Sequence, residues 1–242
     1  MKRLHVGAFA ALLLATCSSV QAQSVGGAIP TGEGALPIVR IEEDWIALIR
    51  NPDPEGGAPQ IVNAMSPDGR MDGNYGLFEI NHTSSPEFVK GGFQVQAWND
   101  DSLLQRRNSS TFNVLSRGYD RLEYTTVMEI TNGELKFELT KGKSRTWGKF
   151  ARDGELHASS PTTLTSFTEY NRQHSIDNTS VNVGAHRVEA LYQRRVRFYS
   201  AEGLVQELDT IEVIHRFAKV VTDELKALWE SNPAYFNVEI TE

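Results

Sequence analysis

The feature that most constrains the fold is a recurrent alternation of apolar and polar residues over short runs separated by turns. Glu134–Leu139 is one such run, in which Leu135, Phe137 and Leu139 alternate with polar residues. Thr131-Asn132-Gly133 precedes it and separates it from Arg121–Ile130. Asn-Gly between two alternating runs is a strong hairpin signal, and a period of two is typical of half-buried strands. These runs therefore predict an antiparallel hairpin.

Two further pairs of runs follow the same pattern. Ser200-Ala201-Glu202-Gly203 separates Arg187–Tyr199 from Val205–His215, and a loop over Thr83–Gly92 separates Asn74–Asn81 from Phe93–Trp98. Short strands at regular spacing with turn residues between them predict an all-β antiparallel β-sandwich of the jelly-roll or lectin-like kind.

One segment reads as a helix, and it lies near the end of the chain. Thr222 is a suitable N-cap for Asp223–Glu230, and Pro233 ends the pattern. We therefore expect four segments: a signal peptide (1–22), a flexible Gly/Pro/Ala-rich linker (23–37), a single-domain β-sandwich (38–218) and a C-terminal helix with its tail (219–242).

The first residues predict export. Lys2 and Arg3 precede a short apolar run, Val6–Ala15, and Val20-Gln21-Ala22 has the small residues of a signal-peptidase site. The apolar run is too short for a permanent membrane span, so we expect a periplasmic or extracellular protein. Lipid anchoring through Cys17, the sole cysteine, is the less favoured alternative.

The charge balance limits the classes of partner. The formal net charge is −7 at pH 7, which argues against nucleic acid and anionic membrane surfaces as partners. No later segment is apolar enough to insert into a membrane, and the sequence leaves the oligomeric state open.

The best candidate site is the polar face of the predicted pair Asn74–Asn81 and Phe93–Trp98. A period of two places one set of side chains on the face opposite the core. Amides and carboxylates hydrogen-bond sugar hydroxyls, and tryptophan rings stack on sugar faces. The predicted ligand-binding residues are Glu79, Asn81, Gln94, Gln96 and Trp98. The alternative is an ordinary solvated face, or one in which Trp98 is covered.

Metal and cofactor signals are weak. Asp100 and Asp101 offer oxygen ligands of the kind that calcium takes, but calcium needs six or more oxygens and a plain turn explains them better. The histidines lack metal-ligand spacing, and GxSxG, HExxH, Walker and GxGxxG motifs do not occur. We expect no cofactor, with calcium as the one alternative.

Basic residues cluster in the run YQRRVRFY. Alternation places Arg195, Arg197 and Tyr199 on one face of a strand. Such a face is suited to binding an acidic polysaccharide, but cross-strand pairing with Glu207, Asp209 or Glu212 is the simpler expectation.

Glu207-Leu-Asp209-Thr-Ile-Glu212 matches the pattern ExDxxE and resembles the active-site strand of glycoside hydrolase family 16. The resemblance implies Glu207 as nucleophile, Asp209 as its assistant and Glu212 as acid/base, brought to one face by a bulge. An acidic edge strand is the alternative, because only thirty residues follow Glu212 and the tryptophan-rich segment expected before the motif is missing.

A broader resemblance covers most of residues 41–150. The stretches 58–101 and 131–150 are similar to a group of uncharacterised predicted exported bacterial proteins, which implies export and a β-rich fold but no activity. Our leading hypothesis is therefore a non-catalytic protein that binds glycan or another extracellular polymer. The alternatives are a polysaccharide-active enzyme and a structural envelope or matrix protein.

Overall fold

The fold is described from a computed structural model of the chain. The described residues are 29–30, 32, 34–49, 61–68, 70, 72–82, 92–109, 120–144, 148–170, 188–209 and 212–216. They form two antiparallel sheets and contain no α-helix, so none of them lies in a helix that could cross a membrane. The predicted antiparallel β-sandwich is confirmed.

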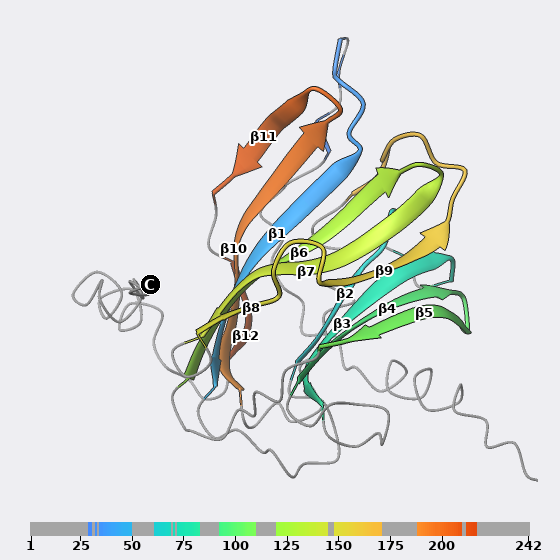
Figure 1. Cartoon of the computed structure of the whole chain (residues 1–242). Coiled ribbons are helices and arrows are strands. Elements are labelled where there is room, and N and C mark those ends of the chain that lie inside the picture. The colour runs from blue at the N-terminus through green and yellow to red at the C-terminus, as the bar shows by residue number, and fades with distance from the viewer. Residues whose placement is uncertain are drawn as a thin grey trace, which may run out of the picture.

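The larger sheet has eight strands (Figure 1). Its main path runs in the order β11-β10-β1-β6-β7-β8, with β12 paired to β10 and β9 paired to β7. The strands are β1 (Arg40–Ile49), β6 (Asp120–Thr131), β7 (Glu134–Ser144), β8 (Gly148–Phe150), β9 (Leu156–Pro161), β10 (Val188–Ser200), β11 (Gly203–Leu208) and β12 (Glu212–Arg216).

The smaller sheet has four strands in sequence order and packs across part of the larger one (Figure 1). They are β2 (Ile61–Met65), β3 (Asn74–His82), β4 (Gly92–Asn99) and β5 (Ser102–Asn108). β9 lies at the junction of the two sheets, because the Ser159 amide on β9 donates to Gln105 Oε1 on β5 (2.6 Å). β5 is the last strand of the smaller sheet, and β9 lies beside it.

The core lies between the inner faces of the two sheets. Phe78, Ile80, Phe93 and Val95 of the smaller sheet are at most 3% exposed, as the alternation predicted. They share one apolar cluster with larger-sheet side chains, among them Ile41, Trp45, Leu122, Met128, Phe137, Leu139, Leu191 and Phe198. The two sheets approach closely at Gly76, where an added Cβ would lie 2.4 Å from the Phe137 ring.

The three predicted hairpin regions form, with some differences in their limits. Asn132 and Gly133 both have positive φ in the turn between β6 and β7, which explains why this signal was reliable. The run Val205–His215 is divided, however, into β11 and β12, which pair with different parts of β10. Ile29, within the segment expected to be flexible, is 4% exposed and belongs to the core.

Several expectations fall on residues outside this description. The signal peptide (1–22), the loop 83–91 and the C-terminal helix 223–230 are among them. The helix therefore gains no support, and the predicted export stays a prediction.

Candidate functional site

The predicted binding residues gather on the outer face of the four-stranded sheet. Cross-strand pairing places Glu79 opposite Gln94, and Tyr75 opposite Trp98, with Gln96 between them on β4. Asn81 lies in β3, but its side chain falls outside the description. The period-two prediction for this face is correct.

Hydrogen bonds connect these side chains into one network. The Trp98 indole N–H donates to Gln96 Oε1 (2.6 Å). Gln96 Nε2 donates to Glu79 Oε2 (3.0 Å) and also to Gln94 Oε1. Gln94 Nε2 then donates to Asn108 Oδ1 on β5 (2.6 Å). Both amide hydrogens of Gln96 are thus used within the protein, so its orientation is fixed.

Much of this face is buried. Trp98 is 8% exposed, Gln96 7% and Gln94 0%. The Trp98 ring lies parallel to Tyr75, with centroids 6.1 Å apart, in a small cluster with Ala64 and Leu77. Trp98 therefore supports the network from within, and the expected open stacking platform is not observed at this ring.

The pKa of Glu79, a carboxyl group on this face, differs clearly from the ordinary value of a glutamate. Burial disfavours its charged form and raises the pKa of Glu79 to about 7. The hydrogen bond from Gln96 and the positive charge of Arg106 oppose that rise without cancelling it. The carboxyl group therefore changes protonation near neutral pH.

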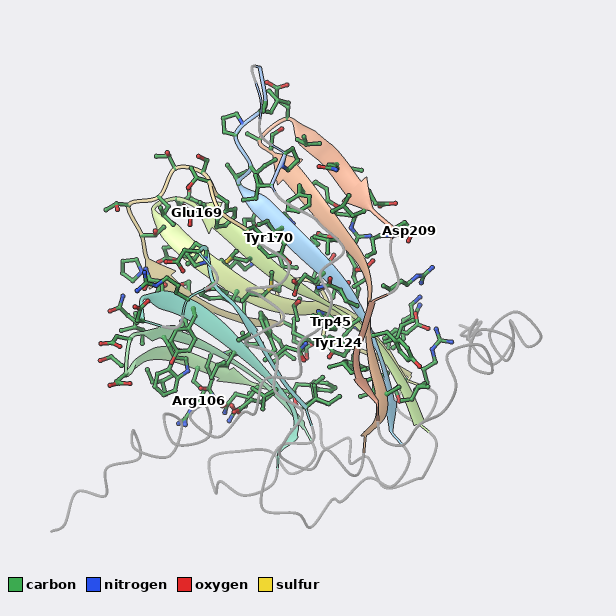
Figure 2. The ribbon with its side chains drawn as sticks, turned by 180° about the vertical axis from the view of Figure 1, so that it is seen from behind. Trp45, Arg106, Tyr124, Glu169, Tyr170 and Asp209 are labelled. Atoms are coloured by element: carbon green, nitrogen blue, oxygen red, sulfur yellow. The ribbon has the colours of Figure 1, made fainter. Side chains whose placement is uncertain are left out.

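The network reaches an open hollow at the end of β5. Asn108, which accepts the hydrogen bond from Gln94, lines this hollow of about 380 Å³ together with Arg106, Arg107 and Glu155. Figure 2 shows Arg106 on the outer side of the four-stranded sheet, on the other side of the molecule from Asp209. Arg106 and Arg107 are both exposed, since β5 is an edge strand.

A second hollow of about 390 Å³ adjoins the first and shares Glu155 with it. The stacked rings of Phe93 and Phe150, with centroids 4.4 Å apart, line its apolar part. Lys149 and Arg152 add cationic side chains. We call the two hollows together the basic hollow; they are lined by Phe93, Arg106, Arg107, Asn108, Ser109, Lys149, Phe150, Ala151, Arg152, Glu155 and Leu156.

The basic hollow carries more positive than negative charge. Arg107, Lys149 and Arg152 form no ion pair with any residue in the described part of the chain, and Arg106 adds a fourth cation. Glu155 is the one carboxylate that lines it, and Glu155 Oε2 accepts a hydrogen bond from the Arg152 amide (3.1 Å). This positive surface contrasts with the net charge of −7 for the whole chain.

The ExDxxE residues are divided between two strands. Glu207 lies on β11, Asp209 follows that strand, and Glu212 begins β12. The resemblance implies a single bulged strand, whereas β11 and β12 are two strands that pair with different parts of β10. Arg195 Nε lies 3.6 Å from Glu207 Oε1 and 3.4 Å from Asp209 Oδ1.

The cross-strand pairing expected for the YQRRVRFY run is observed, with an additional partner strand. Arg195 pairs with Glu207 and Asp209 as predicted. Arg197 instead binds acids of β1, namely Glu42 (2.8 Å) and Asp44 (2.7 Å). The sequence run did not identify β1 as the neighbour of β10, since the two strands are far apart in the chain.

Asp100 and Asp101 form the exposed turn between β4 and β5. Asp100 has a φ of 51°, and its carbonyl accepts a hydrogen bond from the Tyr75 hydroxyl (3.2 Å). In the described part of the chain, no group of three or more His, Cys, Asp or Glu side chains is placed to hold a metal ion. The turn geometry accounts for these two residues.

A buried polar cluster around Glu43 was not predicted. Glu43 is 1% exposed on the inner face of β1 and accepts hydrogen bonds from Gln193 (3.0 Å), Thr126 (3.2 Å) and the Tyr170 hydroxyl. Its negative charge, added to burial, raises the pKa of Tyr124. Figure 2 shows Trp45 and Tyr124 side by side in this region. Adjacent acids at 42–44 gave no signal for which of them would face inward.

The comparisons with known proteins add little to this geometry. No protein-family model matches the chain, and no curated protein matches it. Among solved structures, a human galectin-16 variant is 8% identical with a TM-score of 0.30, covering 79% of this chain and 99% of that chain. Xenopus laevis galectin-Ib is 11% identical with a TM-score of 0.28, covering 78% and 96%. At these identities and scores the likeness assigns no activity.

Proposed function

We propose that the protein is an exported, non-catalytic β-sandwich that binds glycans carrying acidic groups at the basic hollow. The observation that carries the proposal is the meeting of two features at Asn108. A fixed amide network reaches Asn108, and the basic hollow, in which Arg107, Lys149 and Arg152 form no ion pair with any described residue, begins there. The N-terminal pattern around Lys2, Arg3 and Val20-Gln21-Ala22 supports export.

The side chains of the basic hollow suit an acidic sugar. Arg106 and Arg107 offer planar guanidinium groups, which bind carboxylate or sulfate oxygens through two parallel hydrogen bonds. Asn108 offers an amide for hydroxyl groups, and the Gln94 hydrogen bond holds that amide in place. Because the amide is already oriented, binding would lose less conformational entropy.

The test compares an acidic with a neutral oligosaccharide. Isothermal titration calorimetry on the full chain would use oligogalacturonate and a galacto-oligosaccharide of the same length. We expect the acidic oligomer to bind more tightly, with an affinity that falls as salt concentration rises, since its contacts are partly exposed ion pairs.

A matched pair of variants locates the site. Arg107→Gln removes a cation of the basic hollow and should weaken oligogalacturonate binding about tenfold, the value of one lost charge-assisted hydrogen bond. Arg195→Gln removes the same charge on β10 and should leave affinity unchanged. Equal losses in both variants, or no binding of any acidic oligomer, would overturn the proposal.

A further inference from the structure

A separate hollow, outside the basic hollow, lies on the outer face of the eight-stranded sheet. It has a volume of about 170 Å³ and lies over the central strands β1 and β6. Its polar and charged lining comprises Asp44, Glu123, Thr125, Lys141, Lys143, Arg194 and Arg197. We call it the bulge hollow, because irregular strand pairing forms its two sides.

Two register shifts face each other across this hollow. On one side, Asp44 pairs with Arg195 but Trp45 pairs with Gln193, so Arg194 is an extra residue in β10. On the other side, Glu123 pairs with Lys143 but Thr125 pairs with Thr140, so Lys141 and Gly142 of β7 stand opposite the single residue Tyr124 and β7 carries one extra residue. Bulges of this kind redirect side chains and are common beside functional sites.

The backbone at Lys141 is also unusual. Its φ is 56°, in the left-handed region that non-glycine residues seldom occupy, where each such residue costs on the order of 1 kcal/mol. This conformation places Lys141 at the bulge hollow, where its Nζ lies 3.1 Å from Glu42 Oε2. A strained residue at a bulge beside a hollow is consistent with a local function.

The charges around the bulge hollow are only partly neutralised. Arg197 is bound by Asp44 (2.7 Å), and Lys141 by Glu42. Lys143 and Arg194 are exposed and form no ion pair with any other described residue. Burial lowers the pKa of Arg121, and the positive charge of Arg194 lowers it further.

We propose that the bulge hollow binds a single oxyanion group, such as phosphate, sulfate or carboxylate, through Lys143 and Arg194. Arg197 and Lys141 form its cationic background, and Asp44 and Glu123 keep their own partners, Arg197 and Arg121. Its volume is less than half that of either part of the basic hollow, which fits one anionic group better than a chain of sugars. The inference stands independently of glycan binding at the basic hollow.

Thermal unfolding of the full chain in sodium sulfate, sodium phosphate or sodium chloride at equal ionic strength tests this site. A ligand that binds the folded state raises Tm, by an amount set by its concentration relative to Kd. Sulfate and phosphate also stabilise folded proteins in general, because they are excluded from protein surfaces. A variant with an equal charge change is therefore needed as the reference.

The test variant is Lys143→Gln with Arg194→Gln, and the control is Arg70→Gln with Arg195→Gln, which removes the same charge at two residues outside both the bulge hollow and the basic hollow. We expect the control to keep a saturable rise in Tm with sulfate or phosphate, and the test variant to show an apparent Kd at least tenfold weaker. A rise that never saturates in wild type, or equal behaviour of the two variants, would overturn the proposal.

A further comparison identifies the source of the oxyanion. Glucose 6-sulfate is compared with inorganic sulfate on wild type, with glucose as the blank. Tighter binding of glucose 6-sulfate would assign the site to an anionic group presented by a sugar, and tighter binding of inorganic sulfate would assign it to the free ion. Failure of both to saturate would contradict the site.

Discussion

Two carboxylates occupy comparable places on the outer faces of the two sheets and have opposite surroundings. Glu42, on the larger sheet, is 3% exposed and contacts Arg40 (2.7 Å), Lys141 (3.1 Å) and Arg197 (2.8 Å). Glu79, on the smaller sheet, accepts one hydrogen bond from the neutral amide of Gln96. One face is thus built from ion pairs, and the other from amides and aromatic rings.

The difference shows that the partners of a buried acid decide whether burial raises its pKa. Burial alone would raise the pKa of Glu42, but the hydrogen bond from Arg40 and the charges of Lys141 and Arg40 outweigh it and lower that pKa. Burial also raises the pKa of Glu79, and there Gln96 and Arg106 are too weak to reverse the rise. Glu42 is therefore charged when Glu79 is still protonated.

The largest expected effect comes from Glu42→Gln. It leaves three cations without their shared acid, and we expect a loss of about 3 kcal/mol in the free energy of unfolding at pH 7. Because the pKa of Glu42 is lower in the folded protein, its contribution is present above the unfolded-state pKa and is lost on acidification. Urea unfolding at pH 7 and pH 3 should therefore give a smaller difference at pH 3.

The matched control for that variant is Glu129→Gln. Among the described residues, Glu129 forms an ion pair with Arg40 alone (3.0 Å), and both side chains are about one-quarter exposed. We expect a loss of about 0.5 kcal/mol or less. Equal losses in the two variants would contradict the central position of Glu42.

Glu79→Gln should act in the opposite direction. A carboxyl group with a raised pKa binds its proton more tightly when folded, so wild-type stability should decline as pH rises from about 4.5 to about 7. Glutamine removes that decline. We expect the variant to match wild type near pH 4 and to be more stable by about 2 kcal/mol at pH 8, measured by urea unfolding. A variant less stable at pH 8 would show that Glu79 is charged and well paired.

Trp98→Phe tests the supporting role of the indole N–H. The change leaves the buried Gln96 Oε1 without its donor, which should cost about 1 kcal/mol in the free energy of unfolding. Since the ring is 8% exposed, oligogalacturonate affinity should change less than twofold. A large loss of affinity at unchanged stability would restore Trp98 as a ligand-stacking residue.

The smallest expected effect is that of Arg195→Gln. Arg195 contacts Glu207 and Asp209 at 3.6 and 3.4 Å, and Asp209 is largely exposed. A surface pair of this geometry contributes only about 0.3 kcal/mol. Thermal unfolding should place the variant within about 1 °C of wild type.

The sequence predicts the sandwich well because its strongest signals are local. The Asn132-Gly133 turn and the alternation in β3, β4 and β7 depend on residues close together in the chain. The pairing of β1 with β10 joins residues about 150 apart, and nothing local encodes it. The same limit hides the ion-pair partners of Arg197 and the inward position of Glu43.

The sequence predicts only part of the candidate site. Alternation correctly places Glu79, Gln94, Gln96 and Trp98 on one face, but it carries no information on what lies above that face. The basic hollow joins residues from β5 and from the segment 149–156, so it depends on the position of β9 beside β5. The basic pair Arg106-Arg107 beside Asn108 was the one local signal for it.

The central claim, acidic glycan binding at the basic hollow, is tested most directly by mapping where the ligand binds. ¹H–¹⁵N spectra of the full chain would be followed during titration with oligogalacturonate at fixed salt. We expect saturable shifts that are largest at 106–109 and 149–156. Shifts that are largest around Lys143 and Arg194, or no saturable shift anywhere, would contradict it.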